Sequence, residues 1–122
     1  MAGLASVLII DDSSVVRQYY REVLVSGGHA VDEAANGYEA LEMIYREDYD
    51  VLIVDVNMPK MDGLSFLRNL RSSPELHQAA AIVISTEGEE EDLLFGYRAG
   101  CNLYLVKPVE PGDLLAYVEI LG

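Results

Sequence analysis

The sequence predicts an α/β fold, a doubly wound parallel sheet with helices on both faces, and three observations lead to it. Short continuous apolar runs alternate along the chain with stretches whose apolar residues recur at helical spacing. Gly, Pro, Asn, Asp or Ser bound these segments, as is typical of helix ends and turns. The chain has 122 residues, a length that suits one domain built from alternating strands and helices.

The first half of the chain predicts three strands and two helices. Each strand is an apolar run bounded by polar or turn-forming residues, and the predicted ranges are 7–10, 30–35 and 51–55. Ser13 or Ser14 can cap the first helix, and Gly27-Gly28 ends it. Asn36 can cap the second helix. The residues expected on its apolar face are Ala40, Leu41, Ile44 and Tyr45.

The second half predicts three helices and two strands. A helix marked by Leu64, Leu67 and Leu70 stops near Ser73-Pro74. Strands are expected at 80–85 and 103–106, with a helix at 89–99 between them. The inward residues expected on this helix are Leu93, Leu94 and Tyr97, and its acidic first turn, 89–92, complements the helix dipole. The last helix starts at Pro111 and is expected to bury Leu114, Leu115, Val118 and Leu121.

Composition excludes several kinds of protein. The formal net charge is −13, so direct nucleic-acid binding is not expected. The longest apolar stretch, 79–84, is far too short to span a bilayer, and no membrane insertion is expected. A single cysteine, Cys101, rules out a disulfide within the chain, and a cytoplasmic location is the simplest expectation.

Three aspartates are predicted to meet at one edge of the sheet. Asp55 ends the central strand, and Asp11 and Asp12 follow the first strand. In the flavodoxin-like strand order 2-1-3-4-5, taken from known examples of the fold, these strands are neighbours and ligands bind at their carboxyl ends. Clustered carboxylates repel one another, and a hard divalent cation relieves the repulsion. This predicts a Mg²⁺ site, although Asp11-Asp12 taken alone favours helix capping.

A lysine and a hydroxyl are predicted at the same edge. Lys107 follows the last strand, and Ser85 or its neighbour Thr86 ends the fourth. A carboxylate nucleophile, a metal cation, an ammonium group and a hydroxyl donor are the groups that phosphoryl transfer to Asp55 would need. The plain alternative for Lys107 is a surface lysine, and its place at a strand end argues against that.

Four motifs together resemble the signature set of the response-regulator receiver domains of two-component signalling. They are Ile9-Ile10-Asp11-Asp12, the segment 54–63 (VDVNMPKMDG), Ile84-Ser85-Thr86 and Val106-Lys107-Pro108. Their order and spacing match the family over essentially the whole chain, which implies a single receiver domain at residues 1–122. Val109 departs from the pattern, because many family members carry an aromatic residue there.

The resemblance implies a role for each residue of the predicted site. Asp55 would accept a phosphoryl group from a phosphohistidine of a histidine kinase or a histidine phosphotransfer protein. The implied Mg²⁺ ligands are Asp11, Asp12, Asp55 and the backbone carbonyl of Asn57, with Asp12 more direct than Asp11. Lys107 would pair with the phosphoryl group. Such a domain is not an enzyme in the usual sense, because it catalyses only its own phosphorylation and dephosphorylation.

The resemblance also implies a switch. Ser85 lies 22 residues before Lys107, which is the family spacing, so the switching hydroxyl is assigned to Ser85 and not Thr86. Tyr104 occupies the position of the aromatic residue that changes rotamer with it. The output surface would be the helix 89–99, the strand 103–106 and the last helix, including Tyr97, Tyr104 and Tyr117, and would engage a downstream protein or an attached effector domain.

Asn57 and Glu87 are expected to tune the phosphoryl lifetime. Each lies two residues after a predicted site residue and would overhang the phosphoryl group, where an amide and a carboxylate can orient an attacking water. The pair resembles that of CheY-like single-domain regulators, which implies rapid self-dephosphorylation.

Other functions remain as alternatives. A phosphorylation-independent, receiver-like interaction module is the main one, and the complete acceptor set argues against it. A phosphohydrolase of the haloacid-dehalogenase type would need an acid where Asn57 stands. A flavin or nucleotide carrier would need a Gly- or Ser/Thr-rich loop where Asp11-Asp12 stands. The chain ends at Gly122, and either a stand-alone regulator or a domain of a longer response regulator is expected.

Overall fold

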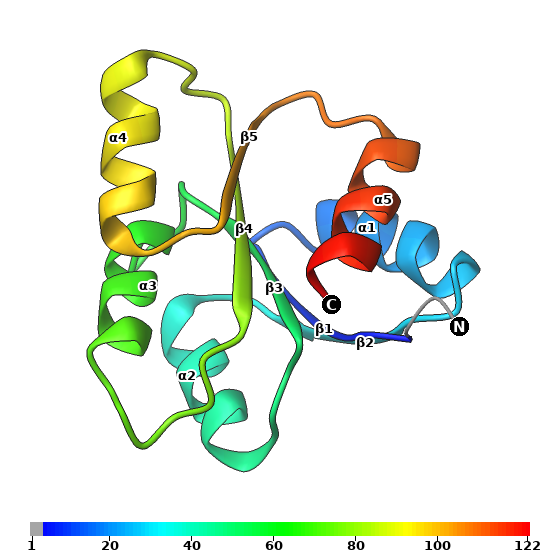
Figure 1. Cartoon of the computed structure of the whole chain (residues 1–122), viewed down its shortest axis with the longest axis horizontal. Helices are drawn as coiled ribbons and strands as arrows, with labels where there is room; N and C mark the ends of the chain where they lie inside the picture. Colours follow the sequence, from blue (N-terminus) through cyan, green and yellow to red (C-terminus); the bar gives the residue numbers. More distant parts are fainter. Residues whose placement is uncertain (1–3) are drawn as a thin grey trace.

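The protein forms a five-stranded sheet between two groups of helices (Figure 1). The structure is a computed structural model, and it describes residues 4–122. The strands are β1 (Ser6–Ile10), β2 (Ala30–Ala34), β3 (Val51–Asp55), β4 (Ala80–Ser85) and β5 (Leu103–Val106). The helices are α1 (Ser14–Ser26), α2 (Gly37–Arg46), α3 (Gly63–Arg71), α4 (Glu90–Ala99) and α5 (Pro111–Leu121).

The sheet is parallel, with the strand order β2-β1-β3-β4-β5. The predicted flavodoxin-like order is therefore confirmed, as is the doubly wound α/β class. β1 and β3 are neighbours in register, with Ile10 opposite Val54. Their carboxyl ends therefore lie side by side, which is where a sheet of this kind changes the direction of winding and binds ligands. Residues 1–3 of the predicted domain lie outside the described residues.

Two hydrophobic layers sandwich the sheet. In β1, Leu8 and Ile10 face one layer and Val7 and Ile9 face the other, because successive strand side chains point to opposite faces. Helices α2, α3 and α4 cover the first face, and α1 and α5 cover the second (Figure 1). All five residues of β3 are buried, as expected for the central strand of a parallel sheet covered on both faces.

Local sequence explains how the helices next to the site begin. The Ser13 hydroxyl caps α1 by accepting a hydrogen bond from the N–H of Val16 (3.3 Å). The Asp62 carboxylate caps α3 and accepts from Leu64 N–H and Ser65 N–H, both at 3.0 Å. Asn36 caps α2, as predicted. These caps fix where each helix starts relative to the strand end before it.

Gly63, the first residue of α3, lets this helix begin directly beside Asp55. Its N–H donates to the carbonyl oxygen of Val56 (3.0 Å), which closes the loop after β3. A Cβ at this position would overlap the carbonyl oxygen of Asp55. The absence of a side chain therefore permits the close approach of helix and strand.

Some predicted orientations are wrong. Leu94 and Tyr97 were expected to face inward, but they are 48% and 45% exposed, and the buried residues of α4 are Gly96 and Ala99. Tyr45 was expected on the apolar face of α2 and is 64% exposed. In α4 the small side chains let the helix lie close to its neighbours, which turns the larger ones outward. Over residues 4–122, none of the helices has the length and apolar content that a membrane crossing requires.

Candidate functional site

Three carboxylates converge at the carboxyl ends of β1 and β3. Asp11 and Asp12 directly follow β1, and Asp55 is the last residue of β3. Each offers one oxygen, and these oxygens all lie within 4.8 Å of one another. Asp11 and Asp55 are 4% and 5% exposed, whereas Asp12 is open to solvent. The neighbouring register of the two strands brings these residues together from positions 44 residues apart in the sequence, Asp11 to Asp55.

The environment of Asp11 disfavours its ionised form. The pKa of Asp11 is raised to about 6, mainly by burial and in smaller part by the nearby charges of Asp55 and Asp12. The N–H of Ser13, which donates to Asp11 Oδ1 at 2.9 Å, and the charge of Lys107 act in the opposite direction. The fold therefore holds a carboxyl group in a place where a negative charge is poorly compensated by the protein alone.

Among residues 4–122, Asp55 has one direct cationic partner. The Nζ of Lys107 lies 3.2 Å from Asp55 Oδ1. Burial raises the pKa of Asp55, and the charge of Asp12 raises it as well. The hydrogen bond and charge of Lys107 lower it, and the resulting pKa remains above the ordinary value of an aspartate. Lys107 reaches the site because its backbone N–H donates to Ser85 O (2.8 Å), which extends the pairing of β5 with β4.

The donor set fits a hard divalent cation. In the described part of the chain, three carboxylates face a single ammonium group, so these residues together carry excess negative charge. Mg²⁺ takes oxygen ligands, and its protein sites commonly combine one or two carboxylates with water and phosphate oxygens. Burial is the largest cause of the raised pKa values of Asp11 and Asp55, and a bound cation would offset this cost of their ionised forms.

Two predicted switch residues hold the backbone of Glu87, one at its N–H and the other at its carbonyl oxygen. Ser85 is fully buried, and its Oγ accepts a hydrogen bond from the N–H of Glu87 (3.0 Å). Tyr104 is 7% exposed, and its hydroxyl donates to the carbonyl oxygen of Glu87 (2.8 Å). Glu87 lies three residues before α4 starts at Glu90. Any movement of either hydroxyl therefore acts on the segment that leads into this helix.

The Tyr104 ring occupies space left by a glycine. A Cβ on Gly96 of α4 would lie 2.5 Å from Cδ2 of Tyr104. The Tyr104 N–H also donates to the hydroxyl of Tyr97 (3.3 Å). Tyr104 was expected on the output surface, but here its side chain is buried beneath α4, while Tyr97 is exposed and Tyr117 is partly buried.

The remaining predicted residues lie around the rim. Asn57 and Glu87 are exposed, and among residues 4–122 neither side chain makes a hydrogen bond to Asp55. Thr86 is also exposed and directly follows β4. Val109 lies in the loop between β5 and α5 and packs partly against the α1–α5 layer.

Sequence reasoning missed Arg17. Its guanidinium donates to the backbone carbonyl of Asp11 (2.7 Å) and to Glu33 of β2 (2.9 Å). Arg21 pairs with the other oxygen of Glu33 at 2.5 Å. Arg17 thus ties α1 to the peptide that carries the acidic pair. The sequence offered one clue, because Arg17 and Arg21 are spaced one helical turn apart on the helix that follows Asp12.

Comparisons with known proteins point to one family. The family model of the response regulator receiver domain matches residues 7–119. A chemotaxis protein CheY homolog of Campylobacter jejuni is 37% identical over 118 residues, which cover 94% of this chain and 91% of that protein. The structure of Vibrio cholerae chemotaxis protein CheY4 superposes with a TM-score of 0.90 at 34% identity, covering 98% of this chain and 100% of that one.

A third relative is much longer than this chain. The gliding motility regulatory protein of Myxococcus xanthus is 39% identical over 101 residues. The match covers 83% of this chain and 13% of that protein. Sequences of this kind therefore occur both as most of a small protein and as a small part of a large one.

Proposed function

The chain belongs to the response-regulator receiver domain family, and we propose that it accepts a phosphoryl group on Asp55. The observation that carries this proposal is the convergence of three carboxylates and the Lys107 ammonium at one strand edge. Asp55 is the member of the trio that contacts Lys107, at 3.2 Å. As a CheY-like receiver domain, the chain is part of two-component signalling.

The transfer needs charge compensation more than acid–base chemistry. A carboxylate oxygen of Asp55 attacks the phosphorus, and negative charge spreads over the phosphoryl oxygens. Lys107 is placed to neutralise part of that charge, because its Nζ already lies beside the attacking carboxylate. Burial of Asp55 strengthens these interactions, since water is largely excluded on the strand side.

Asp12, Asp11 and the Asn57 carbonyl would hold Mg²⁺ together with Asp55. Asp12 is the most accessible of the three carboxylates, and it is proposed as a direct ligand, with Asp11 acting more remotely. The ion would supply positive charge to phosphoryl oxygens during transfer. Arg17 supports this arrangement by holding the backbone carbonyl of Asp11.

Ser85 and Tyr104 are proposed as the switch. A phosphoryl group on Asp55 adds nearly two negative charges and strong acceptor oxygens. If the Ser85 hydroxyl turns to donate to it, the N–H of Glu87 loses its partner. The segment 86–89 and α4 then shift, and the equilibrium between two surface arrangements of α4, β5 and α5 changes. Thr86, the neighbouring hydroxyl, is open to solvent, which favours Ser85 for this role.

Asn57 and Glu87 are proposed to set the lifetime of the phosphoryl group. Both are exposed at the rim of the site, where water has access. An amide and a carboxylate at these places can orient an attacking water, so Asn57→Arg with Glu87→Lys should lengthen the phosphoryl lifetime severalfold. An unchanged lifetime would remove both residues from this role.

The partners proposed are those of the family. A histidine kinase or a histidine phosphotransfer protein would donate the phosphoryl group, and the α4-β5-α5 surface would engage a downstream protein or effector domain. Residues 1–122 would act as one receiver domain that modifies only itself, in the cytoplasm and without direct contact with nucleic acid. The acidic surface, with a net charge of −13, supports the last point.

The decisive experiment is intact mass spectrometry after incubation with acetyl phosphate and Mg²⁺. The wild type should gain one phosphoryl group, and chelation of the metal should prevent it. Asp55→Asn should show no gain. Asp113→Asn, which changes an exposed carboxylate in the first turn of α5, should behave like the wild type. No gain in the wild type under any condition would favour the phosphorylation-independent interaction module.

A further inference from the structure

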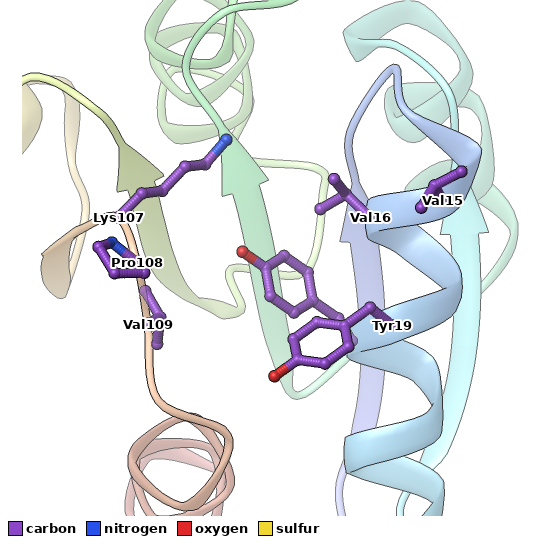
Figure 2. A pocket seen from close by; sticks show the side chains of 7 residues that line it. Val15, Val16, Tyr19, Lys107, Pro108 and Val109 are labelled. Atoms are coloured by element: carbon purple, nitrogen blue, oxygen red, sulfur yellow. The ribbon is translucent and has the colours of Figure 1, made fainter.

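An apolar groove lies beside the proposed acceptor carboxylate (Figure 2). It has a volume of about 580 Å³ and runs between the first turns of α1 and the loop that joins β5 to α5. The lining residues are Val15, Val16, Tyr19, Tyr20, Lys107, Pro108 and Val109. Figure 2 shows Val15, Val16 and Tyr19 on one side and Pro108 and Val109 on the other.

Apart from Lys107, the side chains that line the groove are uncharged, and Val109 is a small one. A larger residue at position 109 would fill space that the small valine leaves open. Val15 and Tyr19 are 76% and 45% exposed, which is unusual for large apolar side chains that share one groove. The ring of Tyr20 lies 5.8 Å from that of Tyr19 and is buried. Burial and the nearby negative charges of Asp11 and Asp55 raise the pKa of Tyr20 to about 12, so this wall stays neutral.

Lys107 belongs to both the groove and the acidic site. Its aliphatic stem lines the groove, and its Nζ lies 3.2 Å from Asp55 Oδ1. A molecule whose phosphoryl group reaches Lys107 Nζ can therefore place an apolar remainder along the stem of the same lysine, in the groove. The ammonium group suits the anionic phosphoryl end, and the apolar lining suits an aromatic or aliphatic remainder.

We propose that the groove binds the apolar part of a phosphodonor, so that the domain reacts with aromatic acyl phosphates in preference to acetyl phosphate. This inference rests on the proposed function of Asp55 as the acceptor. The inference adds a class of phosphodonor, and it assigns the preference for aromatic donors to Val15, Tyr19 and Val109.

The chemistry of such a donor suits the groups at the site. A carboxylate oxygen of Asp55 forms a bond to phosphorus while the bond between phosphorus and the acyl oxygen breaks. The aryl carboxylate leaves with the electron pair and needs no proton, because a carboxylic acid is ionised at neutral pH. Lys107 supplies charge, and the Asn57 amide at the rim has no acidic proton to give.

The test compares benzoyl phosphate with acetyl phosphate as donors to the full chain in the presence of Mg²⁺. Intact mass spectrometry gives the second-order rate constant of phosphorylation for each donor, and their ratio is the quantity of interest. The wild type should favour benzoyl phosphate by about tenfold, which corresponds to about 1.4 kcal/mol. This is a modest gain for a phenyl ring in place of a methyl group, since the groove is open to solvent on one side.

Two variants test whether the groove causes the preference. Val109→Trp fills the groove and should reduce the ratio to near one, and Val15→Gln should reduce it in the same direction without filling the space. Val25→Trp is the matched control, because Val25 is 51% exposed at the far end of α1 and does not line the groove. The Val25→Trp variant should keep the wild-type ratio. The two donors differ in intrinsic reactivity, but this difference is the same for every variant and cancels when their ratios are compared.

The outcomes separate this inference from the proposed function. Equal ratios in the wild type and in all three variants, with both donors phosphorylating Asp55, would overturn the inference and leave the acceptor role intact. Such a result would assign the groove to contact with a protein surface. Failure of both donors, with the fold intact by circular dichroism, would overturn the acceptor role and the inference together.

Discussion

Two acidic clusters in this protein carry similar charge, but they differ in how they are assembled from the sequence and in how deeply they are buried. One is the strand-edge cluster of Asp11, Asp12 and Asp55, drawn from two strands that are distant in sequence. The other is the helix-start cluster of Glu89, Glu90, Glu91 and Asp92, which are consecutive in sequence. The first is mostly buried, and its carboxylate oxygens lie close together. The second is mostly exposed.

Backbone geometry explains the difference. Parallel strands deliver their terminal side chains to one point, so repulsion among the strand-edge carboxylates is relieved by a cation or by protonation. A helix spreads its first turn around an axis, and its N-terminal N–H groups already favour negative charge. The Asp92 carboxylate accepts from the N–H of Glu89 (3.2 Å), which is such a favourable contact. Acidic residues therefore indicate a site only when separate elements force them together.

The largest expected effect concerns local stability. Asp55 of the strand-edge cluster ends β3, whose five residues are all buried. The helix-start cluster begins α4, in which the buried residues are Gly96 and Ala99. Amide hydrogens within α4 should therefore exchange with solvent at least about 100-fold faster than those of β3. Native-state hydrogen exchange followed by NMR measures this. Equal protection would mean that α4 is too firmly packed to serve as the proposed moving element.

A smaller effect is expected on metal affinity. Asp12→Asn should weaken Mg²⁺ binding by about 30-fold, because it removes a proposed charged ligand. Calorimetric titration of the metal into the chelator-treated protein measures the change. The double variant Glu90→Gln, Glu91→Gln removes more charge and should alter the affinity less than about twofold. A similar loss in both proteins would show that general surface charge, and not the strand-edge cluster, attracts the cation.

A still smaller effect is expected on stability without metal. The pKa of Asp11 is raised to about 6 in the folded state, so its contribution to stability is present at about pH 4 and is lost as the pH rises through about 6. Asp11→Asn should therefore increase the free energy of unfolding at pH 7 by about 1–2 kcal/mol. It should also make this free energy depend less on pH between pH 4 and 6. The amide oxygen can still accept from Ser13 N–H.

Urea denaturation with chelator present measures that change. Glu91→Gln in the helix-start cluster should shift the free energy of unfolding by less than about 0.5 kcal/mol. A lower free energy of unfolding for Asp11→Asn at pH 7 would contradict the view that the ionised carboxylates of the strand-edge cluster destabilise the folded protein.

The smallest effect is expected from the capping contact of α4. Asp92→Ala should lower the free energy of unfolding by about 0.5–1 kcal/mol, because the N–H of Glu89 loses its acceptor. Glu90→Ala removes a charge from the same turn without removing that contact and should cost less. Urea denaturation of the two variants compares them directly. Equal losses would mean that the helix dipole alone accounts for the cluster.

Much of this architecture could be predicted from the chain. The bounds of β3, β4 and β5 agree with the predicted ranges, and strand order brings Asp11, Asp12, Asp55 and Lys107 to one edge as expected. Apolar runs bounded by turn residues leave few alternatives for where a strand ends. The prediction of which α4 residues face inward failed because residues 93–97 include no charged residue. Without a charged residue, the sequence does not mark which face of the helix is exposed.

Contacts between distant elements were the part that sequence could not provide. His29, in the loop between α1 and β2, is 5% exposed, and its Nδ1 accepts from the N–H of Ala5 (2.9 Å). The bridge from Arg17 to Asp11 and Glu33 links three elements. The groove depends on α1 lying opposite Val109. Each of these depends on three-dimensional packing, which local patterns do not encode.

The glycine at the start of α3 limits how this sequence can change. Because any Cβ at Gly63 would overlap the backbone of Asp55, substitution there would have to displace the strand end itself. In a library randomised at position 63 and selected for folded protein, glycine should be recovered almost exclusively, whereas position 112, where a Cβ would meet nothing within 4 Å, should accept many residues. The backbone that carries the proposed acceptor carboxylate therefore constrains its neighbour at position 63 to a residue without a side chain.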